Sequence, residues 1–266
     1  MKLVVAVLSL ACVANAQWPL TIIDVLEKVG NETTLISLTK QAGLYNRLNG
    51  LGKVLEAHLV TGKVPIVDWT NDKLIPTVGG PNIRINVYDI SRAAITLTAN
   101  GAGVVNPDCH AIAGFVQVID LVMYPLPNGT IVSEITSNNN LSTLATAVSK
   151  AGLVATLSAV NGNFTLFAPT NKAFSKLPPG VLDGLLKNVT ALTNVLTYHV
   201  LSDVYNNVGL YYSSKLKTVQ GKNVTIKASS RESIMVNNAA VLAEISTTNG
   251  VLHVIDTVLI PPTMHF

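Results

Sequence analysis

The residues with the widest chemical range in this sequence are histidines, and two of them, His199 and His253, lie in regular patterns. His199 follows Leu192 and Val195 at helical spacing, which predicts that it lies on the apolar stripe of a helix. His253 lies in an apolar run that predicts a β-strand. A histidine in either setting can form a hydrogen bond with a nearby backbone group. Gln117 replaces His253 in the other copy of an internal repeat and can form the same kind of bond. We therefore interpret both histidines as structural.

Motifs that carry catalysis are missing from the sequence. It has no Gly-x-Ser-x-Gly elbow, no His-Glu-x-x-His pair, no phosphate-binding glycine loop and no Cys/His cluster at metal-ligand spacing. Asp120 and Asp256 each follow a strand pattern and are interpreted as turn-forming residues. We expect a protein that is not an enzyme and has neither a cofactor nor a metal site. A hydrolase with an unfamiliar site is the alternative.

Composition and the N-terminus narrow the class further. The 266 residues carry 18 basic and 15 acidic side chains, and the basic ones are scattered, which argues against nucleic-acid binding. An apolar run over residues 3–13, followed by Ala14-Asn15-Ala16, predicts a signal peptide of residues 1–16. No later run is long enough for a membrane-spanning helix. We expect a protein secreted to the extracellular space or matrix and not spanning a membrane.

Two further features fit a secreted protein. Cys12 lies in the predicted signal peptide, which leaves Cys109 as the single cysteine of the secreted chain. We interpret Cys109 as a small buried hydrophobe, with an intermolecular disulfide as the alternative. Six Asn-x-Ser/Thr sequons predict N-glycosylation. They begin at Asn31, Asn128, Asn140, Asn163, Asn188 and Asn223.

A domain-sized repeat organises the chain. Residues 34–48 match residues 143–157 without a gap, and residues 114–120 match residues 250–256. About ten residues separate Leu48 from His58, whereas about forty separate Leu157 from His199, so the first copy lacks about thirty residues. We assign residues 17–126 to the shortened copy, 127–262 to the complete copy and 263–266 to a tail.

Each copy is predicted to begin with helices and to end with short strands, which is an α+β arrangement. In the second copy, helical spacing predicts helices over 142–155, after Thr170, after Gly180 and over 192–200, with a strand at 164–168 between the first two. Its closing strands are expected at 224–227, 233–236, 240–242 and 251–258. In the first copy a helix is expected over 35–48 and strands at 83–88, 94–98, 104–105 and 115–122.

Three blocks of the second copy carry a family resemblance. Residues 163–171, with Ala173-Phe174 after them, resemble the first signature of the fasciclin-type extracellular adhesion domain. Residues 249–256, continuing to Pro261-Pro262, resemble the second signature, and Tyr198-His199 resembles the tyrosine-histidine pair between the two. The resemblance covers residues 130–262. It implies tandem α+β domains, each a wedge of short, largely antiparallel strands packed with helices, with the first copy truncated.

The resemblance also implies a function in binding. Family domains are thought to engage integrin-type receptors through the Tyr-His element and an Asp-Ile pair, which points to Tyr198, His199, Glu244, Ile245 and Asp108. A longer arm at Glu244 and a Cys109 in place of Ile weaken that transfer, and solvated loop carboxylates are the alternative. We expect a secreted cell-adhesion or extracellular-matrix protein that binds matrix polymers, cell-surface receptors or itself, the last through the first copy or Cys109. A carrier of apolar small molecules or lipids is the second hypothesis.

The shortened first copy admits three explanations. The missing central strand and helices expose apolar surface and unpaired strand edges. One explanation is that the domain is locally reorganised. A second is that it covers the gap by contact with another domain or chain. The third is that the sequence is a shortened isoform or gene model.

Overall fold

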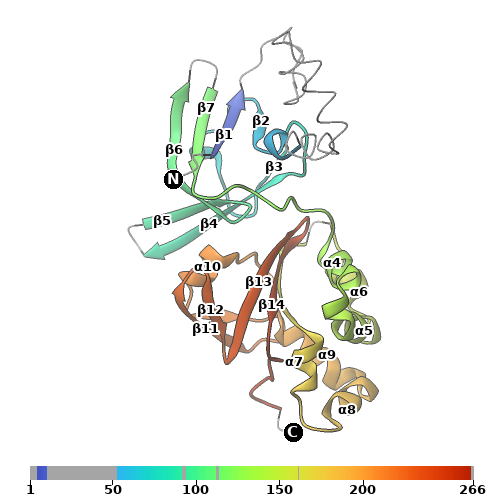
Figure 1. The fold of residues 1–266 in the computed structure, drawn as a ribbon. Helices are drawn as coiled ribbons and strands as arrows, with labels where there is room; N and C mark the ends of the chain where they lie inside the picture. The colour runs from blue at the N-terminus through green and yellow to red at the C-terminus, as the bar shows by residue number, and fades with distance from the viewer. Residues whose placement is uncertain (1–4, 11–52, 92–93, 112–113, 161, 265–266) are drawn as a thin grey trace, which may run out of the picture. The chain divides into compact units, whose positions relative to one another are not determined.

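The computed structural model describes residues 5–10, 53–91, 94–111, 114–160 and 162–264 (Figure 1). The chain divides into two compact units. The first contains Met1–Ile85 and Leu97–Leu126, and the second contains Asn86–Thr96 and Pro127–Phe266. The chain has two seven-stranded sheets, one in the second unit and one that lies mainly in the first unit, although its residues 86–96 are counted with the second.

The sheet of the second unit has the strand order β10-β11-β12-β13-β14-β8-β9. Within it, β14 runs parallel to β8, with Leu252 opposite Leu166, and the other neighbouring strands described are antiparallel. The bounds are β8 Phe164–Pro169, β9 Val200–Leu201, β10 Lys215–Lys217, β11 Asn223–Ser230, β12 Ser233–Val236, β13 Ala239–Thr247 and β14 Gly250–Ile255.

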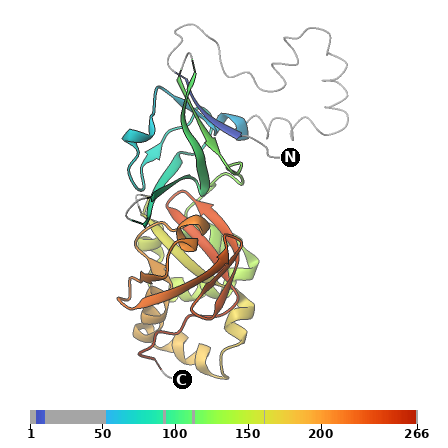
Figure 2. The same ribbon diagram turned by 90° about the vertical axis from the view of Figure 1, so that its left-hand side faces the viewer.

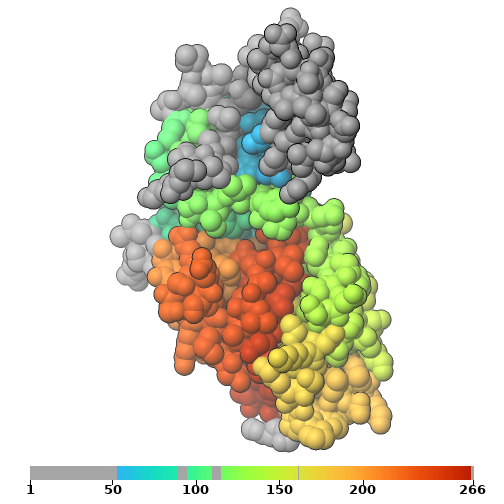
Figure 3. Space-filling model, viewed as in Figure 1, coloured from blue at the N-terminus to red at the C-terminus, as the bar shows by residue number. Residues whose placement is uncertain are grey.

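Helices α4 to α9 of the second unit contribute to one face of this sheet, whereas α10 packs against β11 and β12 on the other. The turned view shows the strands coloured orange and red in front of the light-green helices (Figure 2). In the space-filling view, helices α4 to α6, in light green, lie along the flank of the strands coloured orange and red (Figure 3). The bounds are α4 Ile131–Ser137, η2 Asn139–Leu141, α5 Ser142–Lys150, α6 Val154–Leu157, α7 Asn171–Ser175, α8 Val181–Lys187, α9 Val189–Tyr198 and α10 Asn207–Tyr211.

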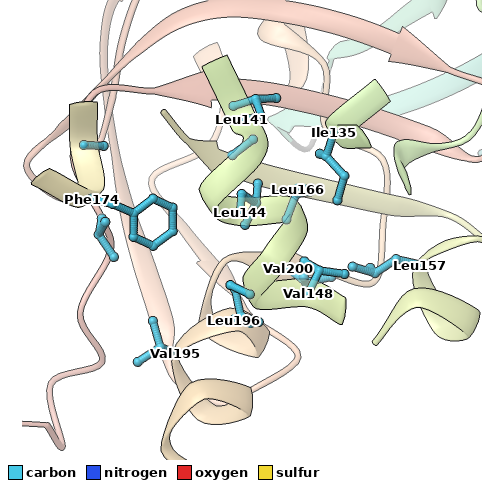
Figure 4. Packing of buried hydrophobic residues seen from close by; sticks show 14 of the residues in the cluster. Ile135, Leu141, Leu144, Val148, Leu157, Leu166, Phe174, Val195, Leu196 and Val200 are labelled. Atoms are coloured by element: carbon cyan, nitrogen blue, oxygen red, sulfur yellow. The ribbon is translucent and has the colours of Figure 1, made fainter. Parts of the chain in front are cut away.

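Alternation along β8 places apolar side chains on both faces of the sheet. Leu166 and Ala168 belong to the larger cluster, between the sheet and the helices, where Leu144 and Leu196 also pack (Figure 4). Phe167 faces the opposite cluster, formed with strands β10 to β13. Both clusters consist of residues with almost no exposed surface, so β8 is buried on both faces and anchors the unit.

The first unit has the strand order β2-β1-β7-β6-β5-β4-β3. Its bounds are β1 Val5–Leu10, β2 Leu59–Thr61, η1 Ile66–Asp68, β3 Leu74–Ile75, β4 Ile83–Ser91, β5 Ala94–Ala99, β6 Ala102–Ala111 and β7 Gly114–Ile119. Read from β3 to β2, this order matches that of the second sheet from β10 to β9, with β1 in the position of β8. The directions differ, because β1 is antiparallel to β7 whereas β8 is parallel to β14.

The α+β class and the tandem organisation predicted from the sequence are confirmed, and several boundaries are corrected. The helix predicted over 142–155 is broken at Gly152, whose φ of 69° interrupts it between α5 and α6. The closing strands end at Ile119 and Ile255, earlier than predicted, because an aspartate follows each. The helix predicted over 35–48 lies outside the described residues. Among those that are described, no helix is long and apolar enough to span a membrane.

Candidate functional site

Tyr198 and His199, at the end of α9, are almost completely buried. The Tyr198 hydroxyl donates to the carbonyl of Asn223 (3.0 Å) and accepts from the side-chain amide of Asn237 (3.1 Å). His199 Nδ1 lies 2.8 Å from the Val195 carbonyl, and its Nε2 accepts from the backbone N–H of Leu259 at 2.9 Å. Burial lowers the pKa of His199 to about 4, although the Val195 carbonyl opposes that shift. The imidazole is therefore neutral and bound on both nitrogens at physiological pH.

His58 makes the same pair of contacts in the first unit. Its Nδ1 lies 2.7 Å from the carbonyl of Val54, four residues earlier, as in His199 and Val195. Its Nε2 accepts from the backbone N–H of Met123 at 3.1 Å, just beyond β7. Each histidine thus ties the residues before a short strand, β2 or β9, to the segment that follows the closing strand. The repetition supports the structural interpretation of His199.

Glu244 lies on β13 and caps the N-terminus of α10. Its Oε2 accepts from the backbone N–H of Asn207 at 2.5 Å. Burial raises the pKa of Glu244 to about 7, and the Asn207 hydrogen bond opposes this shift. The alternative of a solvated loop carboxylate is therefore wrong for Glu244, which is half-buried in a strand. Ile245, beside it, packs against the helix-side cluster.

Asp108 plays the matching part in the first unit. Its two carboxylate oxygens accept from the backbone N–H of Ile66, at the start of η1, at 3.1 and 3.2 Å. The Gln117 side chain donates to Asp108 Oδ1 at 2.6 Å and accepts from the Asp108 N–H at 2.7 Å. The two acids predicted to contact receptors therefore share one observed role, the capping of a short helix by a side chain of the penultimate strand.

His253 and Gln117 hold equivalent places with different partners. His253 is paired in register with Glu244, and its ring stacks on Phe167 with centroids 5.8 Å apart. Its Nε2 lies 2.7 Å from the Tyr205 carbonyl, and its Nδ1 has no hydrogen-bond partner among the described residues. Burial lowers the pKa of His253 to about 4, against the effect of the Tyr205 carbonyl.

Asp256 and Asp120 close the two sheets in the same way. Asp256 Oδ1 accepts from the Ala240 N–H at 2.9 Å, and Asp120 Oδ1 accepts from the Gly103 N–H at 2.6 Å. The reverse backbone bonds, from Asp256 to Ala240 and from Asp120 to Gly103, are also present. Each aspartate therefore links the ends of two adjacent strands, as their interpretation as strand-end residues suggested.

An open groove of about 200 Å³ lies beside Glu244 in the second unit. Leu242 on its wall is 59% exposed, and the Asn207 Oδ1 atom has no hydrogen-bond partner in the described part of the chain. The lining residues are Asn207, Arg231, Glu232, Ile234, Val241, Leu242 and Ala243. Arginine is enriched and glutamate depleted at protein interfaces, so Leu242 and Arg231 are the residues of this groove suited to contact with another macromolecule.

The remaining predicted sites differ in accessibility. Cys109 is half-buried rather than fully buried, because it lies on β6 next to a break in the strand register, and its thiol is free. Four sequon asparagines, Asn128, Asn140, Asn188 and Asn223, are exposed, and Asn163 is half-buried. Asn31 lies outside the described residues. Within the described ranges, no cluster of three or more His, Cys, Asp or Glu side chains could hold a metal ion.

Two asparagines of the signature blocks, the buried Asn249 and the half-buried Asn171, hold the fold together, a role that the sequence analysis did not assign. Asn249 accepts from the Ile131 N–H at 2.9 Å and donates to the Leu157 carbonyl at 2.8 Å. Asn171 accepts from the Thr143 N–H at 2.9 Å and donates to the Asn139 carbonyl at 2.9 Å. Their place beside the apolar runs of the two signatures was the available signal.

The tandem sheets with their shared histidine and acid contacts define a two-domain α+β protein, and comparison with known families identifies the class. The model of the Fasciclin domain family matches residues 31–125 and 139–261, so the chain belongs to the fasciclin domain family.

Known relatives agree with this assignment. The chain is 30% identical over 256 residues to transforming growth factor-beta-induced protein ig-h3 of Sus scrofa, covering 86% of this chain and 36% of that protein. It is 31% identical over 224 residues to human periostin, covering 82% of this chain and 26% of periostin. The chain thus spans about a third or less of the length of these relatives. A solved FAS1 domain pair from the insect cell adhesion molecule fasciclin I aligns with a TM-score of 0.44 and 20% identity over 85% of each chain.

Proposed function

We propose that this chain is a secreted adhesion protein that acts by binding matrix components or cell-surface receptors and performs no catalysis. Its membership of the fasciclin domain family, with ig-h3 and periostin among its relatives, supports this function. The structural observation that supports a binding surface is the open groove with the exposed Leu242. Tandem arrangement would strengthen weak contacts made by each unit.

We further propose that the groove, rather than a metal-bound carboxylate, makes the contact. A carboxylate with a raised pKa that already accepts a backbone N–H is a poor ligand for a divalent cation. The Tyr198 and His199 side chains are buried and use their polar atoms internally. Glu244 and Ile245 lie on the strand that also carries Leu242, so receptor contact in their neighbourhood stays a prediction, which cell attachment to Leu242 and Glu244 variants tests.

Cell attachment to immobilised protein tests the adhesion function. We expect attachment above that on albumin, with and without divalent cations. Attachment equal to that on albumin under both conditions would contradict the proposal. The carrier hypothesis predicts lipid that co-purifies with the secreted protein in native mass spectrometry.

The described cavities give the carrier little support. The apolar cavity of the first unit, which Trp69, Ile85 and Gln117 help to line, measures about 10 Å³. That volume holds about one water molecule, whereas small-molecule sites usually measure about 300 to 1,000 Å³. We therefore place adhesion first.

A further inference from the structure

The two sheets differ in how one position is filled. In the second unit, β8 lies between β14 and β9. In the first unit, the matching position lies between β7 and β2, and β1 fills it, as Figure 1 shows with β1 in blue. All six residues of β1 pair with β7, from Val5 opposite Ile119 to Leu10 opposite Gly114, and three pair with β2. We call this position between β7 and β2 the acceptor slot.

The strand that fills the acceptor slot comes from the predicted signal peptide. Val5–Leu10 falls within residues 1–16, so cleavage after Ala16 would remove it. The slot would then present unpaired backbone N–H and C=O groups on β7 and β2, a costly arrangement unless another strand replaces β1.

Contacts that do not involve β1 hold both walls of the slot in place. His58 links the residues before β2 to Met123 beyond β7. On its other side, β2 is held by the bond from the Val78 N–H to the Leu59 carbonyl (2.9 Å) and by the bridge between Val60 and Thr77. The other edge of β7 is paired with β6. Among the described residues, removal of β1 therefore leaves a gap one strand wide between these two strands.

We propose that the acceptor slot of the secreted chain binds an extended, uncharged, apolar segment of a partner protein, which adds as a β-strand antiparallel to β7. The composition follows from the strand seated there, Val-Ala-Val-Leu-Ser-Leu. The occupant pairs on both sides, so both of its backbone edges must be free before binding. An edge strand of a folded sheet, such as one in a second copy of this chain, has one edge already paired. Main-chain hydrogen bonds to both walls supply affinity, as in other cases of strand addition.

This inference rests on the proposed binding function for its purpose and on signal-peptide removal for the empty slot. A labelled peptide with the sequence of residues 5–10, flanked by lysines for solubility, is the probe. It is titrated into the secreted chain, whose N-terminus at Gln17 is first verified by mass spectrometry. Fluorescence anisotropy measures binding, and hydrogen exchange reports on residues 114–119 and 59–61. The matched control is the same peptide with Val7→Pro and Ser9→Pro, which lacks two ladder donors.

We expect saturable one-to-one binding of the probe, exchange at residues 114–119 slowed by about tenfold or more, and no binding of the proline peptide. The full chain with residues 1–16 retained should not bind, because β1 fills the slot. If the first unit of the secreted chain shows no cooperative unfolding transition by itself, addition of the probe should produce one, because the bound peptide takes the place of β1.

Three results would overturn the proposal: equal binding of the two peptides, full protection of residues 114–119 without peptide, or failure of the probe to restore an unfolded first unit. A dimer of the secreted chain that the probe dissociates would replace the partner segment by a second copy, and so overturn the occupant proposed. Peptide binding does not depend on cell attachment, so failure of this inference and failure of the adhesion function can be told apart.

Discussion

His199 Nε2 accepts a hydrogen bond from the backbone N–H of Leu259, 60 residues later in the chain. The bond joins the end of α9 to the segment beyond β14, so one buried side chain links the helical half of the domain to its closing strand. His58 and Met123 repeat this relationship in the first unit. Histidine side chains can transfer protons or bind metals, but His199 uses both ring nitrogens in hydrogen bonds that hold the domain together.

Replacement of His199 by alanine should destabilise the second unit without altering its surface. The change leaves the Leu259 N–H buried without its acceptor and opens a cavity, which together should cost about 2 to 4 kcal/mol. Urea unfolding followed by circular dichroism measures the loss. Ser149→Ala, on the exposed face of α5, is the control and should change stability by less than about 0.5 kcal/mol. A loss for His199→Ala no larger than for the control would refute the structural role.

Glu244 should make the protein less stable as pH rises. Its pKa is about 7 in the folded protein and 4.5 as the ordinary value, so the folded state binds more protons between these pH values. The free energy of unfolding contributed by this group therefore falls as pH rises from about 4.5 to 7. Glu244→Gln keeps an acceptor for the Asn207 N–H and removes the titration. Thermal unfolding from pH 4.5 to 8 should show a smaller decline in the variant, and identical profiles would argue against a protonated Glu244.

His253 should have the opposite effect. Its pKa is about 4 in the folded protein and 6.5 ordinarily, so the unfolded state binds more protons between these values. The contribution to stability is complete above about pH 6.5 and is lost as pH falls toward 4. His253→Gln introduces the residue that the first unit has at Gln117 and should reduce the acid sensitivity while the domain still folds. An unchanged acid limb in the variant would show that His253 does not cause it.

Sequon accessibility predicts which sites carry glycans. Asn128, Asn140, Asn188 and Asn223 are exposed, and glycosylation of Asn188 leaves its Oδ1 free to accept the Ala191 N–H that it caps. Asn163 is half-buried at the start of β8 and should be the least occupied of these five. Enzymatic deglycosylation in heavy-oxygen water, followed by peptide mass spectrometry, measures each occupancy. Higher occupancy at Asn163 than at the four exposed sites would contradict this ranking.

Sequence patterns predicted the elements that carry local signals and missed those defined by long-range contacts. The apolar run at 164–168 and the threonine cap at Thr170 correspond closely to β8 and α7, because both signals are local. The two-residue β9 and the five-residue α10 have too few residues for a period. Glu244 and Asp108 cap helix termini that lie 37 and 42 residues away in the chain. Their residue types suggested receptor contact, and the capping role could not be seen without the fold.

Position β1 illustrates the same limit. Its apolar run predicted a signal peptide, and only the sheet order shows a strand that lies where the second unit has β8. The missing segment of the first unit was recognised from the repeat, whereas the strand in its place was not expected. Pairing partners distant along the chain carry no periodic signal of their own.

Cell attachment to three immobilised variants tests the central claim most directly, namely that the groove binds and the Glu244 carboxylate supports the structure. Leu242→Asp changes the groove, Val219→Asp changes a comparably exposed apolar residue outside it, and Glu244→Gln removes only the charge. With circular dichroism confirming that each variant is folded, we predict that Leu242→Asp lowers attachment to the albumin background and that the other two retain it. Loss of attachment in folded Glu244→Gln, with Leu242→Asp unaffected, would contradict the account.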